Sequence, residues 1–365
     1  MATKPTITIN FKQLATTLIQ RSERGTAVLF LADSTFSEDK TTECFIYRNV
    51  SQVNSEYDNN YFESEGRKGL LKHIKMCFAS APYEVIAIIA KDYTKLSVFT
   101  NALTSIRKQG WITAPDDTLK DDLASWIKSM EKDGFSFKAV GNKTGVDCKH
   151  YVYFSQASTS LDGEALADTE LMPYILGILA GCNCTRSVTN YKLSELSSCE
   201  EVDDIDKAIG EGQLVITNAD SGVKIVTGIN SLTTLNGNTE TEDMQYIETV
   251  EAMDLIRDDI RDVFANTYQG SFKNKYMNQM LFIGAVNEYF DRLAAEDILD
   301  SEFKNKAEID VEAQRSAWMG TGKAEAEEWD DDTVKRRTFK RSVFIAANIK
   351  ILNCMENLKF TVTME

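Results

Sequence analysis

Short stretches in which apolar and polar side chains alternate lie near both ends of the chain. Residues 6–11 read TITINF and residues 359–364 read KFTVTM. An alternation with a period of two residues, rich in β-branched side chains, is typical of a β-strand. Both segments are therefore predicted to be strands. The apolar positions are Ile7, Ile9, Phe11, Phe360, Val362 and Met364.

A strand at a chain end has a free backbone edge, and two interpretations follow. In the first, both segments are edge strands of the chain's own sheet. In the second, they are arms that add a strand to the sheets of neighbouring copies, because unpaired N–H and C=O groups favour such pairing. The alternation alone is compatible with both interpretations.

Between residues 26 and 155, short apolar runs alternate with amphipathic segments. The runs TAVLFLA (26–32) and VIAIIA (85–90) are continuously apolar, which is the pattern of a strand buried on both faces. The β-α-β order predicts an α/β layer with a mostly parallel sheet. The predicted strands are 26–32, 85–90, 111–113, 135–140 and 151–155, and the predicted helices are 94–110 and 116–134.

The pattern changes in the second half of the chain. Residues 214–229 contain two alternating segments around the turn-forming run NADSG, which predicts a β-hairpin. Apolar residues at helical spacing predict two long helices over 250–264 and 276–293, with a break at Gly270. A strand over 342–351 follows, so the end of the chain is predicted to be a compact α+β unit.

The polar stretch 231–243, rich in Gly, Asn and Thr, is the predicted domain boundary. Residues 33–82 are interpreted as a variable insertion. The predicted organisation is a strand arm and short helix at 1–25, an α/β domain at 26–238, an α+β domain at 239–355 and a strand arm at 356–365.

Composition narrows the class of protein. The chain has 365 residues, of which 43% are hydrophobic and 26% charged, as in ordinary globular proteins. Its net charge of −16 argues against binding to nucleic acid or to anionic membranes. The longest apolar stretch, 171–182, is too short to span a bilayer, and the N-terminus lacks the apolar core of a secretory signal. We therefore expect a protein made in the cytoplasm that does not insert into membranes.

One charged region has two interpretations. An acidic run is followed directly by a basic run, which is typical of a solvated surface helix and the loop before it. The alternative is an ionic contact between subunits. The acidic residues are Glu325, Glu327, Glu328, Asp330, Asp331 and Asp332, and the basic residues are Lys335, Arg336, Arg337, Lys340 and Arg341.

No enzyme signature is complete. The segment GTGK (320–323) ends like a phosphate-binding loop, but it lacks the earlier glycine, the following Ser or Thr and a preceding strand. The two histidines, His73 and His150, are interpreted as structural or surface residues. Seven cysteines do not suggest a disulfide framework, and Cys182 and Cys184 form only half of a metal-site pattern. We expect no catalytic residues, no cofactor and no metal.

Several longer blocks form an ordered series. These blocks are ASWIKSMEKDGFSFKAV (124–140), GILAGCNCTRSVTNYKLSEL (177–196), AIGEGQLVITNADSGVKIVTGINSLTT (208–234), VEAMDLIRDDIRDVFANTYQG (250–270), FIGAVNEYFDRLAAEDIL (282–299), EIDVEAQR (308–315) and SVFIAANIKILNCMENLKFTVTM (342–364). In content, order and spacing they resemble the contractile tail sheath proteins of phages, prophage remnants and R-type bacteriocins, especially the short sheaths of Gram-positive hosts. The chain departs from the family pattern at Gly270-Ser271, where the family has Gly-Lys, and at 353–357, where the family has an acidic turn.

The resemblance implies an architecture and an assembly. The α/β domain would lie outside and the α+β domain would face an inner tail tube. Subunits would form hexameric rings, stacked helically around the tube, and would exchange both terminal arms with neighbours. Contraction would drive the tube through a target envelope, without nucleotide hydrolysis by the sheath.

Partners and site residues follow from the same resemblance. The expected partners are further copies of the chain, the tube protein, and baseplate and tail terminator proteins, in a virion tail or phage-tail-like particle made in the host cytoplasm. Alternatives are another tail component, such as a baseplate protein, and an α/β enzyme with an unrecognised site. The expected arm residues are the six apolar positions named first, the receiving strand would contain Val343, Ile345, Ile349 and Ile351, and the candidate tube contacts are Lys273 and Lys275.

Overall fold

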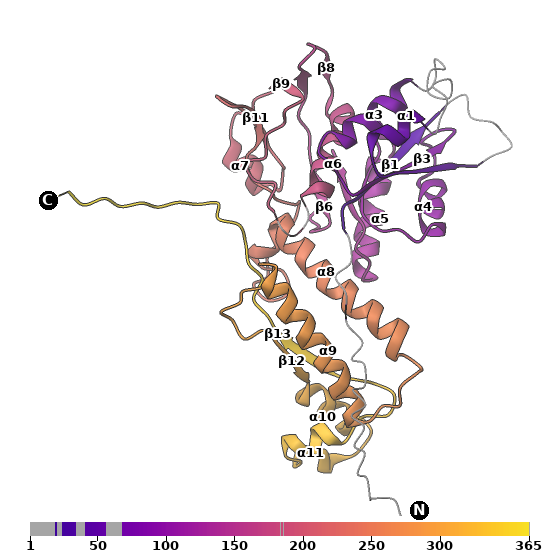
Figure 1. Cartoon of the computed structure of the whole chain (residues 1–365), viewed down its shortest axis with the longest axis vertical. Coiled ribbons are helices and arrows are strands. Elements are labelled where there is room, and N and C mark those ends of the chain that lie inside the picture. Colours follow the sequence, from indigo (N-terminus) through magenta and orange to yellow (C-terminus); the bar gives the residue numbers. More distant parts are fainter. Residues whose placement is uncertain are drawn as a thin grey trace, which may run out of the picture. The chain divides into compact units, whose positions relative to one another are not determined.

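A computed structural model of the chain describes residue 19 and residues 24–33, 41–55, 68–182, 184 and 186–364 (Figure 1). These residues form two compact units. The sheet unit comprises residues 24–256 and 351–364, and the helical unit comprises residues 257–350 with Ile19. The polar stretch 231–243 lies inside the sheet unit.

In the described part of the sheet unit, six strands form one sheet with the order β2-β3-β1-β4-β5-β6. Strand β2, at one edge, is antiparallel to β3. All the other neighbouring strands pair in parallel. The mostly parallel sheet that the sequence predicted is therefore confirmed. The strands are β1 (Thr26–Ala32), β2 (Glu43–Tyr47), β3 (Glu84–Ala90), β4 (Trp111–Thr113), β5 (Lys138–Gly141) and β6 (Tyr151–Tyr153).

Helices cover both faces of this sheet, and successive side chains of β1 point into the two cores on either side. Leu29 belongs to a core shared with helices α3 and α6, whereas Phe30 belongs to a second core shared with α4 and α5. The Phe30 ring stacks on that of Phe99, with centroids 5.0 Å apart. Both faces are buried, which explains the continuous apolar runs. The helices are α1 (Val50–Ser55), α3 (Lys68–Phe78), α4 (Leu96–Ser105), η1 (Asp117–Leu119), α5 (Lys120–Lys132) and α6 (Asp168–Gly181).

The longest apolar stretch of the sequence forms α6, which is buried along most of its length. A Cβ atom at Gly177 would overlap with the backbone carbonyl oxygen of Cys77, so glycine lets α6 approach the end of α3 closely. Among the described helices, none is both long and apolar enough to cross a membrane.

The sequence pattern missed two elements between residues 33 and 82. Residues 43–47 form β2, which buries only Phe45 and Tyr47 because it lies at the sheet edge. Residues 50–55 form α1. Each element is short and surrounded by polar residues, so neither one produces a periodic signal of useful length.

A smaller part of the sheet unit follows α6. The predicted hairpin is confirmed, because β10 and β11 are antiparallel and pair Ala219 with Gly222. Its turn is tighter than predicted, since only Asp220 and Ser221 lie between the strands. The elements are β7 (Ser158–Ser160), β8 (Ala165–Leu166), β9 (Leu196–Cys199), α7 (Ile205–Gly210), β10 (Ile216–Ala219) and β11 (Gly222–Ile225).

The two predicted long helices are present. The short 3₁₀ helix η2 (Glu242–Gln245) precedes α8 (Ile247–Val263), which continues into a π-helical turn, η3 (Phe264–Tyr268). Helix α9 (Tyr276–Ala295) follows. Between them Gly270 has φ +76°, a conformation that favours glycine and ends the first helix. The division between the two units falls within α8, after Ile256.

The rest of the helical unit contains a small antiparallel ribbon of two strands, β12 and β13, as far as the described residues show. The predicted strand over 342–351 is too long, because β13 pairs only along the four residues of β12. Strand β12 ends where Asp310 caps the next helix. The elements are β12 (Lys306–Ile309), α10 (Val311–Met319), η4 (Ala324–Glu327), α11 (Asp331–Arg336) and β13 (Ile345–Asn348).

Candidate assembly surface

The ribbon in the helical unit has one covered edge and one open edge. Asn287 of α9 covers the outer edge of β12, since its side-chain amide donates to the carbonyl oxygen of Ala307 at 3.2 Å and its oxygen accepts the Ala307 N–H at 2.7 Å. This contact prevents another strand from pairing with β12 at that residue. Of the two ribbon strands, β13 is therefore the one whose outer edge no described side chain is shown to cover in this way.

Residues 343–351, which extend β13 at both ends, are called the β13 segment, and hydrogen bonds fix which of them have backbone groups that face β12. Asp310 donates its N–H to the carbonyl oxygen of Phe344 at 3.0 Å, and Asp300 donates to that of Lys350 at 2.8 Å. Backbone groups of successive strand residues point to alternate sides. The even-numbered residues of this segment therefore face β12, and the odd-numbered residues face away from it.

All four residues predicted for a receiving strand have odd numbers, so their backbone N–H and C=O groups point away from β12. Val343, Ile345, Ile349 and Ile351 are half-buried, and Ile345 alone lies within β13. None of the described residues provides a backbone partner on the outer side of this segment. The segment thus presents an open row of N–H and C=O groups, which is the geometry that a further strand requires.

The C-terminal residues form no helix or strand within the described chain (Figure 1). Phe360, Val362 and Met364 are 80%, 65% and 90% exposed, which is unusual for large apolar side chains. The segment therefore does not act as an edge strand of any described sheet. Ile7, Ile9 and Phe11 lie outside the described residues.

The base of the C-terminal segment is held by three hydrogen bonds inside the sheet unit. The N–H of Cys354 donates to Glu248 at 2.9 Å, the hydroxyl of Thr249 donates to Asn353 at 3.0 Å, and that of Ser187 donates to Glu356 at 2.9 Å. Sequence reasoning missed these contacts. The only signal was the departure from the family pattern at 353–357, where two asparagines replace acidic residues.

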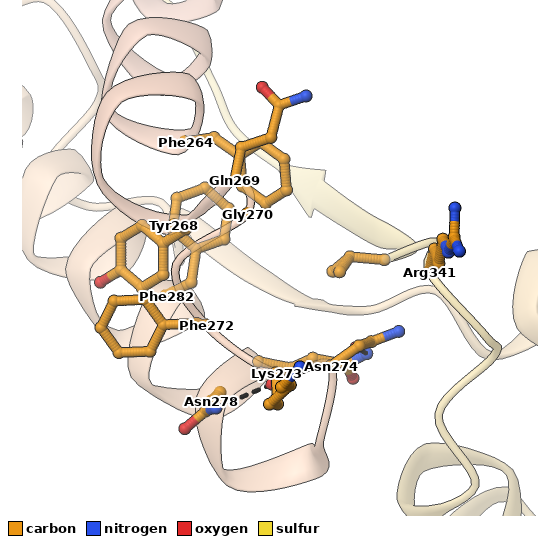
Figure 2. A pocket seen from close by; sticks show the side chains of 12 residues that line it. Phe264, Tyr268, Gln269, Gly270, Phe272, Lys273, Asn274, Asn278, Phe282 and Arg341 are labelled. Carbon is orange, nitrogen blue, oxygen red and sulfur yellow. Dashed lines mark hydrogen bonds between the residues drawn. The ribbon is translucent and has the colours of Figure 1, made fainter.

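Lys273 and Lys275 are exposed in the turn between η3 and α9. This turn borders a cavity of about 180 Å³ that lies entirely within the helical unit. Figure 2 shows the rings of Phe264, Tyr268 and Phe282 on one side of the cavity and Arg341 on the other. Asn274 holds the turn against the chain before β13, because its amide donates to the carbonyl oxygen of Ser342 at 2.9 Å.

A buried cluster of charges fixes the first half of α8 in the sheet unit. The ammonium group of Lys138 lies 2.7 Å from Glu251 and 3.0 Å from Asp254, and all three side chains are buried. The indole N–H of Trp111 also donates to Glu251 at 2.7 Å, and His150 lies 3.1 Å from Asp254. These contacts join α8 to strands β4 and β5 and to the start of β6. They explain why such polar residues are found in a core.

The same cluster continues on the other side of His150. Lys149 lies 2.6 Å from Glu131, and the thiol of Cys148 donates to Glu131 at 2.8 Å. Burial acts to raise the pKa of Glu131, but these two hydrogen bonds outweigh it and hold the pKa below its ordinary value. His150 is buried between Glu131 and Asp254, so of the two interpretations from the sequence, a structural or a surface residue, the surface one is wrong.

The structure does not place the phosphate-loop-like segment or the candidate metal ligands in the setting that their chemistry requires. The segment 320–323 follows α10 rather than a strand, so the setting of a phosphate-binding loop is missing. Within the described ranges, no group of three or more His, Cys, Asp or Glu side chains is placed to hold a metal ion.

Comparisons with known proteins point to one family. Residues 239–365 match the phage tail sheath C-terminal domain. Along its whole length, the chain is 28% identical to the tail sheath protein of Clostridium phage phiCD119, in an alignment of 370 residues that covers 100% of both chains.

Solved structures share the fold at lower identity. The crystal structure of the sheath tail protein from Desulfitobacterium hafniense has a TM-score of 0.66 at 14% identity, with 84% of this chain and 94% of that chain covered. The contracted helical sheath of the anti-feeding prophage has a TM-score of 0.69 at 10% identity, with 100% of both chains covered. The matched domain, the full-length relative and the shared fold thus confirm that this chain resembles the contractile tail sheath proteins.

Proposed function

We propose that the chain is a sheath subunit that polymerises as stacked hexameric rings around an inner tail tube and contracts to drive this tube through a target cell envelope. One observation carries the proposal. The β13 segment has an open backbone edge, and the C-terminal residues 358–364 alternate apolar and polar side chains without a partner in the described chain. The two features are complementary, and they occur in the same molecule.

Exchange of strands between copies would satisfy both features. The C-terminal arm of one copy pairs with the β13 segment of another, so that backbone hydrogen bonds supply affinity and Phe360, Val362 and Met364 become covered. The N-terminal residues Ile7, Ile9 and Phe11 contribute a second strand in the same way. When each copy gives its arm to one neighbour and receives an arm from another, the contact is heterologous and builds rings or helices rather than a closed dimer.

Contraction requires subunits that move while they stay connected. The bonds of Cys354, Asn353 and Glu356 fix the base of the C-terminal arm, and the exposed residues beyond it can bend. Subunits then rearrange as nearly rigid bodies around shared strands. The extended sheath is metastable and is held by a kinetic barrier and by the baseplate, so its contraction needs no nucleotide and no catalytic site.

The remaining partners are the tube, the baseplate and the tail terminator. Lys273 and Lys275 are candidates for the tube contact, because an exposed ionic contact is weak and can be released when the sheath moves. The place of action is a virion tail or a tail-like particle, assembled in the host cytoplasm.

Negative-stain electron microscopy of the concentrated protein at moderate salt tests the proposal. Wild-type protein should form hollow, ridged cylinders. A Phe360→Ser/Val362→Ser variant should fold but stay monomeric, whereas the control Thr361→Ala/Thr363→Ala, which changes the alternate face of the same segment, should assemble. Cylinders from the Ser variant would refute the role of the arm. Small particles from the wild type, even with tube protein added, would refute the sheath function.

A further inference from the structure

The cavity beside the turn between η3 and α9 has an aromatic wall and a rim that carries exposed cations. Its aromatic lining is Phe264, Tyr268, Phe272 and Phe282, and Val343, which also lines it, belongs to the β13 segment. The hydroxyl of Tyr268 and the side-chain oxygen of Gln279 have no hydrogen-bond partner among the described residues, although these residues are only 5% and 3% exposed. Both atoms are themselves buried, so they mark incomplete packing of this wall and are not contact points for another molecule.

The rim of the cavity is positively charged. Lys273 and Arg341 both line the cavity and are exposed (Figure 2). Neither side chain forms an ion pair with any part of the chain that the structure describes. The chain as a whole carries a net charge of −16, so a second copy of it carries many acidic groups that could bind these two cations. An occupant of this cavity should carry carboxylates.

The acidic run on the same unit supplies such groups. Asp330 is already used, because it accepts the N–H of Thr333 at 2.7 Å as the cap of α11. Asp331 pairs with Arg315 at 2.8 Å. The remaining four acids are exposed and form no ion pair within the described residues. They are Glu325, Glu327, Glu328 and Asp332.

The nearby basic run does not neutralise these acids. Arg337 lies over the ring of Trp329 at 4.2 Å, and Arg336 lies over the ring of Tyr276 at 5.2 Å. Two cations that follow the acidic run are thus engaged with aromatic rings rather than with carboxylates. The acidic run and the cationic rim therefore both remain available for contacts outside the chain.

We propose that the acidic run of one copy docks on the cationic cavity of a second copy, with Glu327 and Glu328 against Lys273 and Arg341. The two surfaces are different parts of one unit, so the contact is heterologous and can repeat from copy to copy. The proposal rests on the proposed self-assembly but does not depend on the exchange of arms. Lys273 is then engaged by a second copy, so that of the two candidate tube contacts only Lys275, which does not line the cavity, stays available to the tube.

Charge reversal tests this contact. Variant A is Lys273→Glu/Arg341→Glu, variant B is Glu327→Lys/Glu328→Lys, and a third chain carries all four changes. Variants A and B alone should each lower the sedimented polymer at least tenfold, because each one presents two surfaces of the same sign. The four-fold variant, and an equimolar mixture of A and B, should restore it. Lys132→Glu/Lys207→Glu changes the net charge as variant A does, at exposed sites of the sheet unit, and should assemble normally.

A second measurement separates this contact from the proposed function. Sedimentation velocity of A mixed with B, in dilute solution at low salt, should show an A–B complex that neither variant forms alone and that is lost at high salt. Absence of this complex, or failure of the four-fold variant to recover, would overturn the docking proposal. An A–B complex without any polymer from the wild type would retain the contact and overturn the sheath function instead. Thermal unfolding of each variant confirms that it is folded.

Discussion

Substitution of Lys138 by methionine should strongly destabilise the sheet unit. The ammonium group lies 2.7 Å from Glu251 and 3.0 Å from Asp254, and the three side chains are only 3%, 5% and 2% exposed. Methionine keeps much of the volume but removes the positive charge. Two carboxylates then remain buried without this cation, while the Trp111 indole still donates to Glu251 and His150 still lies beside Asp254.

The expected loss follows from this geometry. Removal of one partner from a buried ion pair costs about 3–5 kcal/mol, because a buried charge is left uncompensated. This amount is a large part of the 5–15 kcal/mol that typically stabilises a domain. For a domain of this size it corresponds to a fall in Tm of roughly 6–20 °C. Urea unfolding followed by tryptophan fluorescence would measure it, since Trp111 lies in the cluster.

Two further variants test whether the loss comes from the buried, unpaired carboxylates. Lys143→Met removes an exposed ion pair with Asp121, at 2.8 Å, and should cost less than about 1 kcal/mol. Lys138→Met/Glu251→Gln/Asp254→Asn removes the whole charge set and should be more stable than Lys138→Met alone. The reasoning is refuted if Lys138→Met unfolds at the wild-type urea concentration, or if neutralising both acids brings no recovery.

Two more predictions concern single side chains. Burial, and then the nearby Lys72, lower the pKa of His73 to about 4, so the unfolded chain binds more protons between pH 4 and 6.5 and the free energy of unfolding rises with pH over this range. The rise should be about 2 kcal/mol between pH 4.5 and 7, and urea titrations at both values should show that His73→Gln reduces the rise by this amount. Asn287→Ala leaves the backbone of Ala307 without partners and should lower the free energy of unfolding by about 1–3 kcal/mol in the same assay, whereas Asn278→Ala, which loses one exposed contact to Lys273, should change it little. Equal effects of the two alanine variants would contradict the role of Asn287.

The sequence by itself determined the elements whose pattern is local. The continuous apolar runs became β1 and β3, the periods of about 3.6 residues became α8 and α9, and Gly270 ended the first long helix. The short edge strand β2 was missed, because five residues with two buried side chains give too little signal. The ordered sequence blocks indicated the resemblance to tail sheath proteins that the comparisons confirm.

Only the tertiary structure decided which strand edges are covered, which stay open, and which charged residues meet in the core. Asn287 covers one edge of the ribbon and leaves the other free, and Lys138 meets Glu251 and Asp254 across the fold. Such pairings join residues that are far apart in the sequence, as Trp111 and Glu251 are, and no periodicity encodes them. Periodic patterns follow from the geometry of one helix or strand, whereas hydrogen bonds, ion pairs and open edges depend on how separate segments meet in space.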